Sequence, residues 1–241
     1  MPWKWYDSTV IDIQEIGPKT RIFRLRIEDD PPLQFTAGQF VTVDLPIHMK
    51  RLRRWRSYSI ANPPDNSNII ELCIVYLEGG LASEYLFHEV KVGTEIKFKG
   101  PSGTFTLPQK LDHDCIMICT GTGVAPFRSM LLDLQQRKAF TRAVHLIFGT
   151  RYQDGILYQE KFEELASQVA NFTYSVTLSR DNQWKGNKGY VHEIYMRKYA
   201  QPVSDRVFYL CGWSSMIDEA VIHLWSELGY DKSQIKYELY G

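Results

Sequence analysis

The 241-residue sequence has no excess of charge of either sign, because 28 Lys and Arg residues balance 28 Asp and Glu residues. Proteins that hold nucleic acid by their overall charge are basic, so this class is not indicated. No apolar run approaches the length of a membrane span. The opening residues, MPWKWYDSTV, lack the apolar centre of a secretory signal. We therefore expect a cytoplasmic globular protein with no membrane span and no nucleic-acid partner.

Cysteine is also scarce, with four residues spread along the chain: Cys73, Cys115, Cys119 and Cys211. This spacing argues against a disulfide framework. Cys115 and Cys119 fall inside the apolar run CIMIC, at a spacing that places both on one face of a strand, so we predict buried thiols rather than a metal pair. Because an iron–sulfur cluster is held by four cysteine thiolates, we expect no cluster and no other metal on this chain.

The first part of the chain has the pattern of an antiparallel sheet. Alternating or apolar segments at residues 20–28, 39–45, 69–77 and 94–100 are separated by Gly, Pro and Asn, which predicts short strands joined by turns. One helix is predicted at residues 79–90. Such a series of strands is typical of a sandwich or barrel.

Near residue 110 the pattern changes to strands that alternate with helices. Strands are predicted at residues 115–119, 143–149, 172–179, 207–212 and 235–241, and helices at 125–138, 158–169 and 215–228, with a loop after residue 180. This alternation predicts a parallel sheet with crossover helices. The fold class is therefore a two-domain α+β protein, an antiparallel sandwich or β-barrel followed by an α/β domain with a five-stranded parallel sheet. We place the boundary within residues 107–114, giving domains 1–108 and 109–241.

Ligands of open α/β sheets bind at the carboxyl ends of the strands. The segment TGTGVAP, residues 120–126, lies at such an end. Gly121 and Gly123 allow close approach of the backbone, the following helix presents unpaired N–H groups to a phosphate, and Pro126 suits a first helical turn. A plain strand–helix turn is the alternative for this segment.

The segment TLSRDNQWKGNKGYV offers a second candidate anion site at a strand end. Ser179 supplies a hydroxyl and Arg180 a bidentate guanidinium, which together suit a monophosphate. Lys188 and Tyr190 could add a cation and an aromatic ring. A solvated loop is the alternative for Ser179 and Arg180.

The stretch KRLRRWRSYSIA contains five basic residues in seven: Lys50, Arg51, Arg53, Arg54 and Arg56. A solvated basic loop, a localisation signal and a nucleic-acid patch are all compatible with such a run. However, the following residues continue into a strand pattern, so Arg56 and Tyr58 are expected on one face of a sheet and Ser57 and Ser59 on the other.

Seven short motifs then occur in an order that resembles the ferredoxin–NADP(H) reductase family: RSYS, GGLAS, GPSGTF, GTGVAP, SR…KGY, CGWSSM and YELYG. The resemblance runs from about residue 8 to the end of the chain. It implies an FAD-binding antiparallel barrel followed by an NADP(H)-binding α/β domain, with a C-terminal Glu-x-Tyr as in plastid-type members.

The resemblance also implies a role for each matched residue. Arg56 would neutralise the FAD pyrophosphate, Tyr58 would stack on the flavin, and Ser59 would bond near flavin N5. Glycine and its neighbours at the start of the first helix would face the same pyrophosphate: Gly80, Leu81, Ala82 and Ser83. The NADP(H)-binding residues would be Thr120, Gly121, Gly123, Pro126, Arg151, Ser179, Arg180, Lys188, Tyr190, Cys211 and Gly212. The catalytic residues would be Ser59, Cys211, Glu238 and Tyr240, with Tyr240 covering the second face of the flavin.

The function implied is hydride transfer between NADPH and FAD and single-electron transfer between FAD and a separate acidic carrier, a ferredoxin or flavodoxin. The basic residues Lys50, Arg51, Arg53 and Arg54 would face that carrier or the adenylate end of FAD. One alternative is an NAD(P)H-dependent reductase component that serves an oxygenase or a cytochrome. An alternative of another class is a non-enzymatic module that binds a nucleotide or a nucleic acid through the basic loop.

Overall fold

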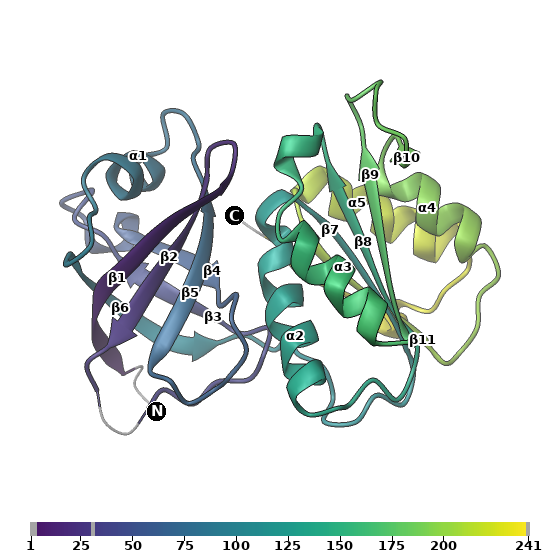
Figure 1. Cartoon of the computed structure of the whole chain (residues 1–241), viewed down its shortest axis with the longest axis horizontal. Coiled ribbons are helices and arrows are strands. Elements are labelled where there is room, and N and C mark those ends of the chain that lie inside the picture. The colour runs from purple at the N-terminus through teal and green to yellow at the C-terminus, as the bar shows by residue number, and fades with distance from the viewer. Residues whose placement is uncertain (1–3, 30–31, 240–241) are drawn as a thin grey trace. The chain divides into compact units, whose positions relative to one another are not determined.

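The computed structural model describes residues 4–29 and 32–239. The chain forms two compact units (Figure 1). The first contains residues up to Thr106 together with Ala125–Asp133, and the second contains Leu107–Val124 and the residues from Leu134 onward. A central helical segment therefore belongs to the first unit although it lies within the second in sequence. The division at residues 108 and 109 into two cofactor domains stays a prediction.

The first unit is a six-stranded antiparallel sheet with strand order β4-β3-β6-β1-β2-β5. Its strands are β1 (Trp5–Gly17), β2 (Thr20–Ile27), β3 (Phe40–Asp44), β4 (Trp55–Ser59), β5 (Ile69–Val75) and β6 (Glu95–Ser102). An antiparallel bridge joins Ile60, which follows β4, to Leu72 on β5. This bridge connects the first and last strands of the sheet. The sheet is therefore closed into a barrel, one of the two architectures that the alternating pattern allows and the one that the resemblance implies.

The barrel core is formed by the inward residues of these strands and by helix α1 (Leu81–His88). Ala82, Leu86 and Val90 join the buried cluster, so the apolar face of α1 covers one end of the barrel (Figure 1). The basic run contains a single 3-10 turn, Arg51–Arg53, directly before β4.

The second unit is a parallel sheet with strand order β10-β9-β8-β7-β11-β12. Its strands are β7 (Asp114–Thr120), β8 (Val144–Thr150), β9 (Phe172–Leu178), β10 (Asn187–Lys188), β11 (Arg206–Gly212) and β12 (Ile235–Leu239). Every pair is parallel. The predicted α/β architecture is confirmed, and the short β10 adds a sixth strand to the five expected.

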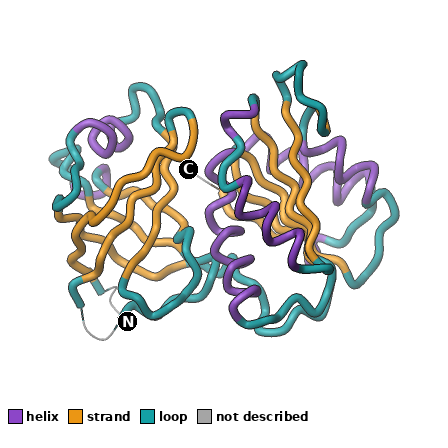
Figure 2. The backbone as a smooth tube through the Cα atoms, in the orientation of Figure 1, coloured by secondary structure: helices purple, strands orange, loops and turns teal. Residues whose placement is uncertain are grey.

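Helices cover both faces of this sheet, as Figure 2 shows. Those of the second unit are α3 (Gln159–Gln168), α4 (Val191–Lys198) and α5 (Ser214–Ile222), and α5 continues into a π-helical turn at His223–Glu227. Most of a further helix, α2 (Val124–Gln136), belongs to the first unit. Helices α4 and α5 share one buried cluster with Ile118, Phe208 and Ile235, and α3 lies in front of the strands in Figure 1, with α5 behind them. No helix in the described part of the chain is both long and apolar enough to cross a membrane.

The structure corrects the loop expected after residue 180. Helix α4 lies within it, with Val191, Ile194 and Tyr195 buried on one face. Their spacing of three and four residues is helical, but the helix has only eight residues and follows a Gly-rich segment, so its signal is weak. The first strand, β1, was also not expected, because its polar residues interrupt the alternation.

Candidate functional site

In the barrel unit, strand β4 carries the aromatic residue of the RSYS motif. Tyr58 lies opposite Val41 on β3 and packs against the buried barrel cluster. Burial raises the pKa of the Tyr58 phenol to about 12, and the nearby Arg56 charge opposes this shift. Tyr58 is therefore neutral at physiological pH, which suits a ring that stacks on a flat apolar ligand. Ser59, the next residue, is buried.

Arg56 is held in a way that leaves its charge available. Its Nη1 atom donates to the carbonyl oxygens of Arg53 at 3.1 Å and Trp55 at 2.7 Å. No ion pair to a carboxylate is formed by Arg56 within residues 4–29 and 32–239. Since a half-buried guanidinium normally pairs with an anion, this arrangement fits a phosphate group supplied by a cofactor.

The start of α1 is the second element of the barrel unit that fits a phosphate. Gly80 at its N-cap provides no side-chain cap. The Ser83 hydroxyl donates instead to the carbonyl oxygens of Leu77 at 2.6 Å and Gly80 at 2.9 Å, so it does not cap the helix. Gly79 has φ of +74° and open space at its Cβ position. The N–H groups of the first turn remain available to an anion, which is what the FAD pyrophosphate requires.

The basic run before β4 is only partly free. Arg54 pairs with Asp44, with 2.7 Å between Nε and Oδ1. The Arg51 guanidinium lies 5.4 Å from the ring centroids of both Trp5 and Trp55. Lys50 and Arg53 are exposed. The surplus charge that can face a partner is therefore smaller than the sequence indicates.

In the second unit, the glycines of TGTGVAP bring two loops together. A Cβ atom on Gly123 would lie 2.4 Å from the carbonyl oxygen of Cys211, and one on Gly212 would lie 2.4 Å from Thr120 Oγ1. Gly121 has φ of +54°, and the nearest atom to its Cβ position is Trp213 Nε1 at 4.0 Å. The close packing of the 3-10 turn Gly121–Gly123 against the end of β11 therefore already requires glycine at position 123, and its predicted approach to a ligand stays a prediction. Gly121 is the glycine with room for a ligand.

The loops after β8 and β9 hold two arginines next to each other. The backbone N–H of Ser179 donates to the Thr150 carbonyl oxygen, and that of Arg180 donates to the Arg151 carbonyl oxygen, both at 3.0 Å. Arg151 and Arg180 are exposed, and neither forms an ion pair with another described residue. The structure therefore joins these predicted residues at the carboxyl edge of the sheet.

Lys188 and Tyr190 follow on the short segment after that loop. Lys188 Nζ donates to the carbonyl oxygen of Asn182 at 2.8 Å, so its charge stays on the same loop as Arg180. Tyr190 precedes α4 and is 65% exposed. An exposed aromatic ring two residues after Lys188 suits an adenosine group.

Two predicted catalytic residues of the second unit, Cys211 and Glu238, lie opposite each other on neighbouring strands. Cys211 on β11 lies opposite Cys119 on β7 and opposite Glu238 on β12. Cys119 and Cys211 are fully buried, and burial raises the pKa of the Cys119 thiol well above its usual range, with Cys211 adding to the shift. The prediction of buried thiols is confirmed. Tyr240 lies outside the described residues.

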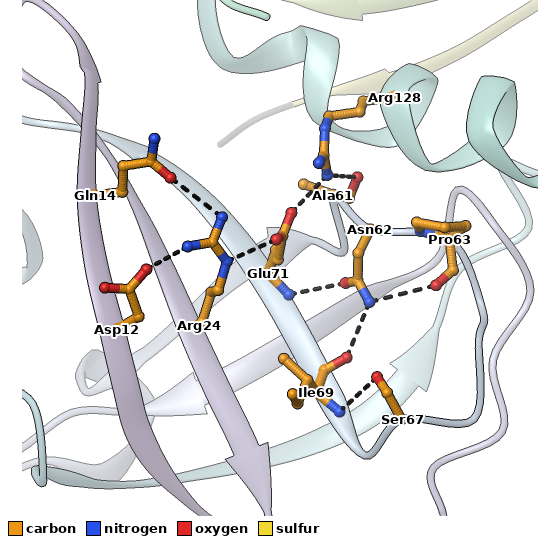
Figure 3. Close-up of polar contacts among 10 residues, drawn as sticks. All are labelled: Asp12, Gln14, Arg24, Ala61, Asn62, Pro63, Ser67, Ile69, Glu71 and Arg128. Atoms are coloured by element: carbon orange, nitrogen blue, oxygen red, sulfur yellow. Dashed lines mark hydrogen bonds and ion pairs between the residues drawn. The ribbon is translucent and has the colours of Figure 1, made fainter. Parts of the chain in front are cut away.

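A polar network in the barrel unit was not visible in the sequence (Figure 3). Arg128 on α2 donates to Glu71 on β5 at 2.6 Å, and Glu71 accepts from Arg24 on β2 at 2.8 Å. Arg24 also contacts Asp12 on β1. These residues are separated by tens of positions in the chain, so no local pattern could have identified them.

Two family models match the chain. The model described as an oxidoreductase FAD-binding domain matches residues 7–107, and that described as an oxidoreductase NAD-binding domain matches residues 117–221. The chain is similar in structure to the Amycolatopsis cytochrome P450 reductase GcoB, with a TM-score of 0.88 and 25% identity over 99% of this chain and 70% of that one.

Among proteins of known function, the chain is 33% identical over 219 residues to the phenol hydroxylase P5 protein of Acinetobacter pittii, covering 90% of this chain and 60% of that protein. It therefore spans about 60% of the length of that relative. It is also 32% identical over 244 residues to ferredoxin–NADP reductase B of Sorangium cellulosum, covering 98% of this chain and 97% of that protein. Because this relative is matched over nearly its whole length, the chain belongs to the ferredoxin–NADP reductase family of FAD- and NAD-binding oxidoreductases.

Proposed function

We propose that this chain is an FAD-dependent reductase that oxidises NADPH and passes single electrons to a separate carrier, a ferredoxin or flavodoxin. The observation that carries the choice of NADPH is the pair Arg151 and Arg180. Their loops are hydrogen-bonded to each other, and both guanidinium groups lack a carboxylate partner among the described residues. The 2′-phosphate of NADPH, which NADH lacks, would supply the missing anion.

The barrel unit would hold FAD through three contacts. Arg56 would bind the pyrophosphate, and the first N–H groups of α1 would bind it from the helix end. Tyr58 would lie flat on one face of the flavin. Bound FAD supplies the conversion between two-electron and one-electron chemistry, since it accepts a hydride and releases electrons singly.

The remaining site residues position groups and do not break bonds. The Ser59 hydroxyl would donate a hydrogen bond near the flavin atom that receives the hydride. Cys211, which is buried, and Glu238, which is partly exposed, would shape the place of the nicotinamide. Tyr240 would cover the second flavin face. Hydride transfer requires close alignment of two rings, so positioning accounts for most of the catalysis expected here.

The second candidate is a reductase component that serves an oxygenase. It is favoured by the similarity to the phenol hydroxylase P5 protein, of which this chain spans about 60%. In that case the electron acceptor would be an oxygenase component or a cytochrome. The two candidates share the barrel site and differ in the nucleotide and in the acceptor.

Rapid mixing of the FAD-loaded protein with NADPH or NADH tests the proposal. We expect flavin absorbance to bleach at lower concentrations of NADPH than of NADH, and ferredoxin or flavodoxin to be reduced afterwards. Preference for NADH would favour the oxygenase candidate. A purified protein that binds no flavin and shifts DNA in a salt-dependent manner would support the non-enzymatic module instead.

A further inference from the structure

Two histidines near Tyr190 share one tyrosine hydroxyl. His192 Nδ1 lies 2.7 Å from the Tyr195 hydroxyl oxygen, and His223 Nδ1 lies 2.8 Å from the same atom. Tyr195 is fully buried on α4, and His223 is the first residue of the π-helical turn that follows α5. The centroids of the two imidazole rings are 5.1 Å apart. These three residues are not among the site residues predicted from the sequence.

The outer nitrogen of each histidine faces a carboxylate. His192 Nε2 lies 2.9 Å from Glu219 Oε2 on α5, which is a hydrogen-bond distance. His223 Nε2 lies 3.8 Å from Glu227 Oε1 in the π-helical turn, which is too long for a hydrogen bond. Burial lowers the pKa of His192 below its ordinary value, His223 adds to this shift, and Glu219 opposes it.

The number of protons in this chain of side chains fixes the direction of each hydrogen bond. Burial raises the pKa of Tyr195, so its hydroxyl keeps its one proton, donates to one histidine and accepts from the other. A carboxylate only accepts, so a neutral His192 donates from Nε2 to Glu219 and accepts the tyrosine proton at Nδ1. A neutral His223 then donates from Nδ1 to the tyrosine oxygen. Its Nε2 atom can take a further proton without breaking any of these bonds.

A second proton on His192 breaks the chain. Its Nδ1 atom then becomes a donor and faces the Tyr195 oxygen, which already accepts from His223, so the tyrosine proton loses its acceptor. When His223 is charged as well, two imidazolium rings repel each other over 5.1 Å in a largely buried place. The chain therefore tolerates an added proton on His223 but not a further one on His192.

The His192 ring also packs beside the exposed ring of Tyr190. The two ring centroids lie 6.3 Å apart with 48° between the planes, which is within the range of aromatic pairs. Tyr190 is 65% exposed and occupies the N-cap of α4, two residues before His192. The orientation of His192 therefore acts on the ring that would contact adenosine.

We propose that His192 is a positioning residue for nucleotide binding, which holds the Tyr190 ring in place and releases it when His192 and His223 are both protonated. Tyr195 connects the two histidines. This inference rests on the proposed function, in which Tyr190 contacts the adenosine group of the nucleotide. Adenosine is common to NADPH and NADH, so the effect applies to both nucleotides. It differs in this from the role of Arg180, which would act on the 2′-phosphate alone.

The pH dependence of nucleotide binding tests this role. We expect the affinity of the FAD-loaded, full-length protein for NAD⁺ and for NADP⁺ to fall roughly two- to tenfold on acidification from about pH 8 to about pH 5.5, the range of one aromatic stacking contact. NAD⁺ is the more direct probe, because the 2′-phosphate of NADP⁺ itself titrates at about pH 6. An affinity that rises on acidification would show that the imidazolium charge attracts a phosphate directly, and would overturn the proposal.

Two variants separate the chain from a general effect of acid. His192→Asn keeps a planar acceptor for the Tyr195 hydroxyl but cannot be protonated, so we expect its affinity for NAD⁺ to be independent of pH. Tyr195→Phe removes the shared hydroxyl, and its affinity at about pH 8 would fall to the wild-type value in acid. His88→Asn, at an exposed histidine of the barrel unit, is the matched control and would keep the wild-type pH profile.

NMR of the imidazole nitrogens examines the chain without any nucleotide. At about pH 8 we expect the Nε2–H tautomer for His192 and the Nδ1–H tautomer for His223, and the opposite assignment would overturn the proposal. A wild-type protein that binds neither nucleotide at this pH would refute the proposed function, and this inference with it. Normal binding with the wild-type pH profile retained in His192→Asn would refute the role of His192 alone.

Discussion

Arg128 Nη1 lies 2.6 Å from Glu71 Oε2 and 2.7 Å from the carbonyl oxygen of Ala61 (Figure 3). This pair joins helix α2 to strand β5 across 57 residues of sequence. Both side chains are largely buried, at 15% and 12% exposed. Ser129 adds a hydrogen bond from its hydroxyl to the Asn62 carbonyl oxygen at 2.7 Å. Hydrogen bonds of Arg128 and Ser129 therefore attach α2 to the barrel in a largely buried place.

Removal of Arg128 is expected to destabilise the barrel unit. In Arg128→Met the Glu71 carboxylate keeps Arg24 but loses its second cation in a buried place, which costs on the order of 3 kcal/mol. Thermal unfolding of the variant would show a clear loss. Lys91→Met, which removes an exposed charge in the same unit, is the control. Combining Arg128→Met with Glu71→Gln would recover part of the loss if the two residues are coupled, and equal effects of Arg128→Met and the control would exclude that coupling.

Arg180→Ala is expected to weaken the binding of NADPH far more than that of NADH. A charge-assisted contact to the 2′-phosphate is worth about 1.5–3 kcal/mol, and the lower end applies because the side chain is exposed. Titration of the flavin spectrum with NADP⁺ and NAD⁺ measures both affinities. Arg197→Ala, an exposed arginine at the end of α4, is the matched control. Equal weakening of both nucleotides by Arg180→Ala would remove the assignment.

Lys50→Gln combined with Arg53→Gln is expected to slow the reduction of an acidic carrier. These two residues are exposed, whereas Arg54 is paired with Asp44 and Arg51, although exposed, lies near two tryptophan rings. Rim charges act mainly on association rates, so the dependence of the rate on ionic strength would also flatten. Reduction of the flavin by NADPH serves as the internal control and would change little. A loss of bound flavin would place the two residues in the FAD site instead.

The two glycines of the nucleotide loop are expected to respond differently to alanine. Gly123→Ala would press a methyl group against the Cys211 backbone and destabilise the second unit by on the order of 3 kcal/mol. Gly121→Ala meets no close atom, so only its left-handed backbone conformation would lower the free energy of unfolding, by about 1–2 kcal/mol. Thermal unfolding compares the two directly. Similar losses would show that the packing of β7 against β11 does not determine the choice of glycine.

Stability is expected to fall between pH 6.5 and pH 5 because of His145. This side chain is buried between the Tyr199 hydroxyl and the Ser175 hydroxyl, and burial lowers its pKa to about 3, with the Lys198 charge acting in the same direction. Below pH 6.5 the unfolded chain gains a proton at His145 while the folded chain does not, so unfolding is favoured. At pH 5 the loss is about 2 kcal/mol.

The pH dependence can be assigned to this residue with His145→Gln. We expect the variant to be less stable than wild type at pH 7 but to lose less stability between pH 6.5 and pH 5. Unfolding by urea at several pH values gives the comparison. Parallel curves for wild type and variant would place the acid sensitivity elsewhere.

The strands and most helices could be predicted because their apolar spacing is local. Phe127, Met130, Leu131 and Leu134 recur at helical intervals, and all four are fully buried on α2. Helix α4 was missed because eight residues contain only two turns of the same pattern. Local spacing thus identifies long elements and fails for short ones.

The candidate site likewise contains residues that local motifs identify and residues whose contacts depend on strand pairing. Motifs such as RSYS and TGTG lie on single strands and loops, so their residues were visible in the sequence. The packing role of Gly123 was not visible because its neighbour, Cys211, is 88 residues away in number and becomes adjacent only when β7 pairs with β11. The neutralisation of Arg54 by Asp44 depends on the β3–β4 pairing in the same manner.

The membership of Ala125–Asp133 in the barrel unit has a consequence for dividing this protein into parts. A single cut in the chain cannot release a complete barrel, because a fragment that ends at Thr106 leaves behind the helix that carries Arg128 and Ser129. Such a fragment would expose the Glu71 carboxylate and the Asn62 carbonyl that these residues satisfy. Exchange of whole modules between relatives would therefore succeed only if this nine-residue helical segment were exchanged together with the barrel.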